Sequence, residues 1–184
     1  MRSTLIDGRD AIVALRQSQD DQADFIAGLL AVGHEAAAQS ETRFSLRLLS
    51  DPRHLLHDVR KEVLAIAREA VLNAFRHAEA EAVWVTVDYA PHALIVSIFD
   101  NGIGVSEQRI EEQQKEGHWG IAGMRERAAK LGGQLMVISS PGKGTAVELE
   151  VSRRHAYAST PFFVRLGTSL TKKWHGWMTG GASR

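Results

Sequence analysis

The chain contains no cysteine among its 184 residues. Disulfide bonds, thiolate metal sites and a cysteine nucleophile are therefore excluded. The absence of cysteine fits a reducing compartment, and we expect the chain to be cytoplasmic. The chain also lacks an excess of either charge, because 22 Lys and Arg residues balance 22 Asp and Glu residues. A neutral chain has no overall field that attracts nucleic acid or an anionic membrane, so we expect neither as a partner.

Long apolar runs are missing as well. The most apolar run covers residues 25–33, whereas a membrane-spanning helix needs about 20 residues. The first residues carry no apolar stretch typical of a secretory signal. We therefore expect no membrane segment in this sequence, and the anchor of any membrane-bound parent would lie elsewhere. The eight histidines are scattered, with no helical pair supported by a carboxylate, so they do not indicate a metal site.

An ordinary balance of 44% apolar and 24% charged residues predicts one globular domain with short appendages. Apolar spacing predicts helices over residues 9–38, 55–78 and 121–131, and alternation predicts strands over residues 44–49, 82–88, 94–99, 135–139 and 145–151. Because hairpins are mixed with helices, the order predicts an α+β fold, a mainly antiparallel sheet with helices on one face.

The helix predicted over residues 55–78 carries a polar strip beside its apolar stripe. Glu69, Asn73 and His77 are spaced four residues apart and share one side of the helix. A solvated surface would produce the same strip. The functional alternative is the rim of a ligand cleft, in which the Asn73 carboxamide suits Mg²⁺ and Glu69 accepts a proton.

Three glycine-containing motifs follow this helix. The sequence DNGIG at residues 100–104 puts a carboxylate directly after a buried-looking strand, with glycines that allow close approach of the backbone. The sequence GHWGIAGMRER at residues 117–127 leads into a helix start, where free N–H groups favour phosphate. The sequence GKGT at residues 142–145 lies between two strands. Taken singly, the first and the last are equally compatible with ordinary turns.

Taken together, the motifs and their order resemble the GHKL superfamily of ATP-binding domains, and most closely sensor histidine kinases of the nitrate-sensor type. Residues 62–78 resemble the family's N box, and the other three motifs resemble its glycine boxes. The resemblance implies the two-layer α/β sandwich of the Bergerat-type ATP-binding fold. It also implies ATP and Mg²⁺ as cofactors. It divides the chain into a helical connector at 1–39, a remnant of a dimerisation hairpin, a catalytic domain at 40–151, and a poorly ordered tail at 152–184.

The resemblance also implies roles for individual residues. Glu69 is the candidate catalytic base, Asn73 the Mg²⁺ ligand, and Asp100 the acceptor of the adenine amino group. Residues 105–124 would form a lid over the nucleotide. The full set of candidate ATP-binding residues is Asn73, Arg76, His77, Asp100, Gly102, Gly104, Gly120, Ile121, Gly123, Met124, Gly142, Lys143, Gly144 and Thr145. Arg125, Arg127 and Lys143 are candidates either for phosphate contacts or for solvated surface.

A histidine kinase also needs a phosphoacceptor histidine on a dimerising helical hairpin. His57 lies at the start of the helix that carries Glu69, and His34 lies too close to the first predicted strand of the domain, so neither leaves room for that hairpin. We therefore expect no acceptor in this chain. The expected partners are the acceptor (dimerisation) domain of a histidine kinase, a response regulator, and a second copy in a homodimer.

Two other functions stay open at the level of sequence. One is a protein serine kinase of the anti-sigma type, built on the same fold. The other is a non-catalytic ATP-binding interaction module. The tail matches nothing in the family, and its Trp174 and Trp177 are compatible either with disorder or with a docking stripe.

Overall fold

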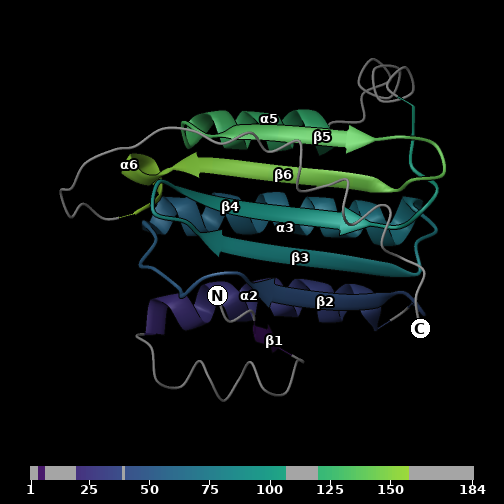
Figure 1. The fold of residues 1–184 in the computed structure, drawn as a ribbon, viewed down its shortest axis with the longest axis horizontal. Helices are drawn as coiled ribbons and strands as arrows, with labels where there is room; N and C mark the ends of the chain where they lie inside the picture. The colour runs from purple at the N-terminus through teal and green to yellow at the C-terminus, as the bar shows by residue number, and fades with distance from the viewer. Residues whose placement is uncertain (1–3, 7–19, 39, 107–119, 158–184) are drawn as a thin grey trace.

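One mixed sheet carries the fold (Figure 1). The computed structural model describes residues 4–6, 20–38, 40–106 and 120–157. The strands are β1 (Thr4–Ile6), β2 (Arg43–Leu48), β3 (Ala82–Tyr89), β4 (Ala93–Asp100), β5 (Gln134–Ser139) and β6 (Thr145–Ser152), in the spatial order β1-β2-β3-β4-β6-β5. Only β2 and β3 run parallel, and every other neighbouring pair is antiparallel. The predicted α+β class, with a mainly antiparallel sheet, is confirmed.

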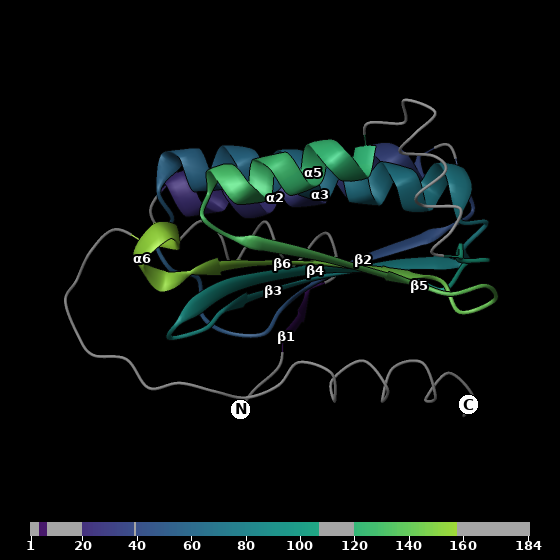
Figure 2. The same cartoon turned by 90° about the horizontal axis from the view of Figure 1, so that it is seen from above.

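Three helices form the second layer. They are α2 (Asp20–Ala37), α3 (His57–His77) and α5 (Gly120–Lys130), and all lie on the same face of the sheet (Figure 2). The predicted two-layer arrangement with helices on one face is therefore confirmed. The predicted helix over residues 55–78 agrees with α3 to within two residues. The first part of the helix predicted over residues 9–38 lies outside the described residues, and the described part begins at Asp20.

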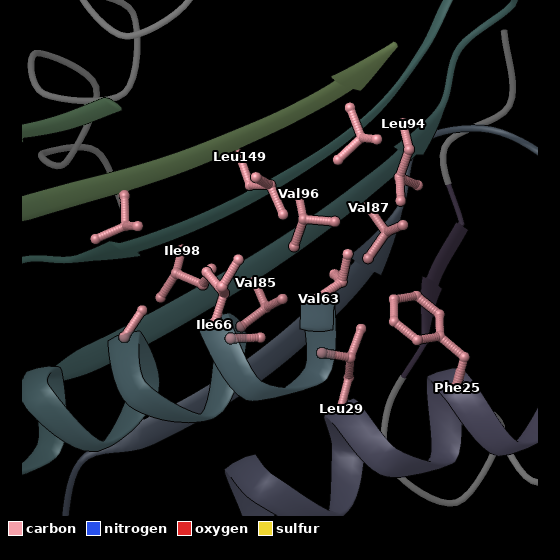
Figure 3. Packing of buried hydrophobic residues seen from close by; sticks show 14 of the residues in the cluster. Phe25, Leu29, Val63, Ile66, Val85, Val87, Leu94, Val96, Ile98 and Leu149 are labelled. Carbon is pink, nitrogen blue, oxygen red and sulfur yellow. The ribbon is translucent and has the colours of Figure 1, made fainter. Parts of the chain in front are cut away.

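The core lies between the two layers. Alternate residues of β3, including Val85 and Val87, face the helices and are almost fully buried. The stripe on α3 meets them, with Val63 and Ile66 pointing into the same cluster (Figure 3). Burying one such side chain stabilises the fold by about 1.5–3 kcal/mol. This packing fixes the rotation of α3, which keeps its polar strip at the margin of the sheet.

The packed domain continues past residue 151, where we predicted the tail to begin. A short helix, α6 (Arg153–Ala156), follows β6, and the Ala156 carbonyl accepts a hydrogen bond from Leu56 N–H at 3.1 Å. The Tyr157 hydroxyl donates to the Ala93 carbonyl at 3.1 Å. Burial raises the pKa of Tyr157 to about 12, so the phenol keeps its proton and remains a donor. The remaining tail, residues 158–184, lies outside the described residues.

Strand β1 was not predicted. A three-residue strand is too short to show alternation, and it is defined only by its pairing with β2. Within the described part of the chain, no helix combines the length and apolarity needed to cross a bilayer.

Candidate functional site

The C-terminal part of α3, which carries the polar strip, lies at the end of the molecule where β4 ends and the β5–β6 turn begins (Figure 1). Glu69 and Asn73 are partly buried at the margin of the apolar stripe. Arg76 and His77 are exposed in the last turn of the helix. The strip therefore grades from a sheltered carboxylate and carboxamide to solvated cationic side chains, rather than being solvated throughout.

Asp100, the last residue of β4, is only 4% exposed. Its Oδ1 atom accepts two backbone hydrogen bonds, from Gly102 N–H at 2.9 Å and from Thr145 N–H at 3.2 Å. Burial raises the pKa of the Asp100 carboxyl, and these two N–H groups partly offset that rise. Among the described residues none donates to Oδ2, so this oxygen is available to a donor on a ligand.

Gly102 lies where the loop after β4 crosses the end of α3. Ile103 N–H donates to the carbonyl of Ala78, the C-cap of α3, at 2.7 Å. A β-carbon on Gly102 would collide with that same carbonyl oxygen. The resemblance implied that Gly102 makes room for a nucleotide ring. The contact with Ala78 is a separate reason for glycine here, because only glycine lets the loop pass this close to the end of α3.

The β5–β6 turn closes onto the same loop. Gly142 N–H donates to the Ile103 carbonyl at 2.6 Å. Gly144 has a φ of +75°, which L side chains rarely adopt, and a β-carbon there would collide with the Asp100 carbonyl. The predicted GKGT turn is therefore joined directly to the predicted DNGIG loop. Lys143 is exposed at the tip of the turn.

Ser139 is a site residue that the sequence analysis missed. Its hydroxyl accepts from Val105 N–H at 2.9 Å, donates to the Gly144 carbonyl at 3.1 Å and lies 2.9 Å from the Thr145 hydroxyl. One serine thereby ties the first residue of the predicted lid to the turn that holds Asp100. Nothing in the sequence marks Ser139, because a serine at the end of a strand is unremarkable until its neighbours are known.

The start of α5 lies against the polar strip of α3. A β-carbon on Gly120 would lie 2.5 Å from Oε1 of Glu69 and 3.5 Å from Nδ2 of Asn73. At the other end of α5, Arg127 Nη1 is 2.7 Å from Oε2 of Glu62. The two helices are therefore antiparallel. The N-terminus of α5, with its free N–H groups and positive dipole end, is directed to the site.

The structure separates the candidates on α5. Gly120 is in contact with Glu69, whereas Gly123 has open space where a β-carbon would be. Met124 is 2% exposed and belongs to the hydrophobic core, and Ile121 packs against that core. The side chain of Met124, one of the candidate ATP-binding residues, thus anchors α5 to the sheet, and a contact of this residue with ATP stays a prediction. Arg127 is exposed at the surface and pairs there with Glu62, and its contact with phosphate stays a prediction.

Residues 107–119, which include most of the predicted lid, lie outside the described residues. Among the residues that the structure describes, no cluster of three or more His, Asp or Glu side chains could hold a metal ion by itself. Asn73 and Glu69 nevertheless supply hard oxygen donors in adjacent turns of α3. Such a partial set fits Mg²⁺, which keeps waters and phosphate oxygens as its other ligands.

Comparison with known proteins agrees with this arrangement. Residues 58–155 match the family described as histidine kinase-, DNA gyrase B-, and HSP90-like ATPase. The chain is 41% identical over 114 residues to the nitrate/nitrite sensor protein NarQ of Escherichia coli, an alignment covering 60% of this chain and 19% of NarQ. It is 37% identical over 93 residues to the sensor histidine kinase LiaS of Bacillus subtilis, covering 50% of this chain and 25% of LiaS.

A solved structure shares the fold. The blue-light activated histidine kinase of Erythrobacter litoralis EL346 superposes with a TM-score of 0.58 at 21% identity, over 77% of this chain and 46% of that chain. The chain spans about a fifth to a quarter of the length of the curated relatives named here. The family match and the identity to sensor kinases show that the chain belongs to the histidine kinase-, DNA gyrase B-, and HSP90-like ATPase family, as an ATP-binding catalytic domain of the sensor histidine kinase type.

Proposed function

We propose that this domain binds Mg²⁺-ATP between α3 and the start of α5 and transfers the γ-phosphate to a histidine on a separate dimerisation domain. The observation that carries the proposal is the burial and hydrogen bonding of the Asp100 side chain. Its carboxylate is buried, Oδ1 is held by two N–H groups, and Oδ2 is available. A fixed acceptor of this kind suits the exocyclic amino group of adenine and discriminates against a base that presents an oxygen there.

The phosphate end of the nucleotide would lie along the polar strip of α3. The Asn73 carboxamide oxygen is the candidate Mg²⁺ ligand, and the N-terminus of α5 at Gly120 offers backbone donors to phosphate oxygens. When bound, Mg²⁺ would neutralise charge on the phosphates. The exposed cationic groups Arg76 and Lys143 are candidates to meet the remaining negative charge.

The transfer needs an acceptor from outside this chain. His57 is the first residue of α3, and about 18 Å of the same rigid helix separates it from Glu69. In the proposed step, an imidazole nitrogen of the acceptor forms a bond to the γ-phosphorus while the bond to the β–γ bridging oxygen breaks and ADP leaves. Glu69 is the candidate to take the proton that the imidazole gives up.

The proposed partners follow from this step. The acceptor domain of a sensor histidine kinase would receive the phosphoryl group and pass it to a response regulator. Dimerisation would come mainly through that acceptor domain. Because ATP is the donor, we expect the domain to work in the cytoplasm.

The test combines binding and transfer. The full chain is titrated calorimetrically with a non-hydrolysable ATP analogue, with and without Mg²⁺, as the parent and as Asp100→Asn and Asn73→Ala. Asp100→Asn should abolish binding, and Asn73→Ala should remove its Mg²⁺ dependence. Asp58→Asn is the matched control, because Asp58 is an exposed carboxylate in the first turn of α3.

Transfer is then followed with labelled ATP and an added acceptor domain from a NarQ-type sensor kinase. Acid-labile, base-stable label on that domain supports the proposal. Binding of the analogue without any transfer to the supplied acceptor would instead support a module that only binds ATP. If both variants bind Mg²⁺-ATP like the parent, the assignment of the site is wrong.

A further inference from the structure

The sheet has a second face, which α2, α3 and α5 leave uncovered (Figure 2). We call it the open face, and define it by the residues of β3 to β6 that alternate with those pointing at the helices. The pairing register aligns Trp84, Phe99, Ala146 and Ile138 in one row across four strands. The Trp84 and Phe99 rings stack with centroids 5.3 Å apart and planes inclined by 23°. The open face therefore carries an apolar row rather than the polar surface expected of a solvated sheet.

One further apolar side chain, Met136, extends this row along β5 from Ile138. Ile138 is 40% exposed and Met136 is 41% exposed, and both are on the open face. They belong to the few large hydrophobic side chains that are exposed among the described residues. An exposed apolar group next to an aromatic row on one face is typical of a surface that contacts another segment or protein.

Next to the apolar row, the open face buries polar groups. Glu148 is 6% exposed and Ser97 is 7% exposed, and the Ser97 hydroxyl donates to Glu148 Oε2 at 3.2 Å. Both point away from the three helices, because their neighbours on each strand face the core. Glutamate is rarely this buried unless it is paired. Since no helix of the described chain covers this face, the burial of Glu148 favours a further segment over the centre of the open face.

The chain's own C-terminal segment has the matching chemistry. Residues 158–184 contain no Asp or Glu. Their cationic residues are Arg165, Lys172, Lys173 and Arg184, and their aromatic residues are Phe162, Phe163, Trp174 and Trp177. The open face offers the complement, since Glu148, Glu150 and Asp88 accompany its apolar row.

We propose that residues 158–184 fold back over the open face, with aromatic side chains on the Trp84–Phe99–Ile138 row and lysines beside Glu148 and Glu150. This inference does not depend on the proposed nucleotide chemistry, because Asp100 and the apolar row are on opposite faces of the sheet. Of the two alternatives that the sequence left for Trp174 and Trp177, disorder or a docking stripe, the proposal selects the docking stripe.

The geometry at the start of the segment allows this path. Tyr157 is held beside Ala93, so the segment starts at the end of the sheet where β4 begins and β6 ends. An extended chain covers about 3.3 Å per residue, which gives residues 158–184 a reach of about 90 Å. A strand of the length of β6 spans only about 27 Å. Length therefore does not limit which part of the open face the segment reaches.

The test is site-specific photo-crosslinking of the full chain. A benzophenone amino acid replaces Ile138, and the control carries it at Lys130, an exposed residue of α5 on the helical side. After irradiation, mass spectrometry identifies the linked peptide. A mixture of isotope-labelled and unlabelled chains separates links within one chain from links between chains.

Links from residue 138 to peptides of 158–184 within one chain, absent from the Lys130 control, support the proposal. Links to the same peptides between chains would overturn it in favour of a second copy. A protein that is folded but gives no link to 158–184 would overturn it as well.

A second set of variants tests the chemistry. In the crosslinking chain, Trp174→Ala with Trp177→Ala should lower the yield of tail links about tenfold, since buried aromatic residues dominate such contacts. Thr168→Ala with Thr171→Ala is the matched control and should keep the yield. Met136→Lys should also lower it by placing a cation opposite Glu148, whereas Met136→Gln should have a smaller effect. Equal yields from all four variants would contradict the proposed contacts.

Discussion

Gly120 faces the carboxylate of Glu69 so closely that a β-carbon on residue 120 would lie 2.5 Å from Glu69 Oε1. This contact joins the first residue of α5 to the polar strip of α3. Position 120 is therefore occupied by glycine because a larger residue would collide with Glu69. The free N–H groups at the start of α5 are brought next to the two side chains proposed to act on the phosphates.

Gly120→Ala should therefore impair transfer without unfolding the protein. The added methyl group meets the flexible end of Glu69, so the carboxylate moves aside and the backbone stays in place. We expect the rate of phosphoryl transfer to fall about tenfold or more, as displacing a positioned group typically does, while ATP affinity changes less. Single-turnover transfer and calorimetry measure the two separately.

Gly123→Ala is the matched control. Nothing lies within 4 Å of a β-carbon there, and alanine is favoured over glycine inside a helix by about 1 kcal/mol. This variant should keep full activity and gain stability. Equal loss of activity in both variants would show that the glycines serve lid motion rather than the contact with Glu69.

Asp100→Asn should abolish ATP binding without lowering stability. The asparagine Oδ1 can still accept from Gly102 and Thr145, but an amide nitrogen replaces Oδ2 and faces the donor of adenine. We expect at least a hundredfold loss of affinity, because an unmatched buried donor costs about 1–3 kcal/mol in addition to the lost bond. Thermal unfolding should give an equal or higher Tm than the parent.

The pH dependence of that stability has a definite sign. Burial raises the pKa of Asp100 above 3.8, so the folded protein holds this proton more tightly than the unfolded chain. The parent accordingly loses stability as pH rises from 3.8 through the folded pKa, and below 3.8 the loss is absent. The Tm of Asp100→Asn minus that of the parent should grow with pH across this window. A difference that shrinks with pH would contradict the raised pKa.

Much of this architecture could be predicted from sequence because its signals are local. Alternation of Val83, Val85 and Val87 marks a half-buried strand, and the stripe on α3 marks a helix against that strand. The motifs around Asn73 and Asp100 pointed to one site because their order matches a known family. The structure adds that the loop after Asp100, the β5–β6 turn and the start of α5 meet at the end of α3.

The parts that sequence missed depend on contacts between distant residues. Ser139 matters because Val105 and Thr145 meet at its hydroxyl, and no pattern along the chain encodes that meeting. Met124 is part of a motif that resembles a glycine box, so the sequence placed it among the ATP-binding candidates and did not predict that its side chain is in the core. Packing of the chain up to Tyr157 depends on the carbonyl of Ala93, which only the fold brings near.

Ser139→Ala should lower both stability and ATP affinity. The substitution leaves Val105 N–H and the Gly144 carbonyl without this partner, which for partly buried groups costs about 1–2 kcal/mol of unfolding free energy. Since Val105 is the first residue of the predicted lid, nucleotide affinity should fall about threefold to tenfold. Urea unfolding and calorimetry measure the two effects.

Ser139→Thr is the control for this change, since it keeps the hydroxyl and threonine suits a strand. It should restore most of the unfolding free energy and most of the ATP affinity. If Ser139→Thr fails as badly as Ser139→Ala while remaining folded, the space around the side chain matters more than its hydrogen bonds.

Arg127→Ala should leave ATP affinity within about threefold of the parent, whereas loss of a direct contact between arginine and phosphate costs about tenfold or more. Arg127 bonds Glu62 at the end of α5 opposite Gly120, so its charge is engaged away from the proposed phosphate end. With the Arg127 side chain 45% exposed, the pair should add about 0.5–1 kcal/mol of stability. A double-mutant cycle with Glu62→Ala isolates this coupling, and the more exposed pair of Lys130 and Glu126 should give a smaller value. A tenfold loss of ATP affinity in Arg127→Ala but not in Glu62→Ala would mean that Arg127 leaves Glu62 for the nucleotide when ATP binds.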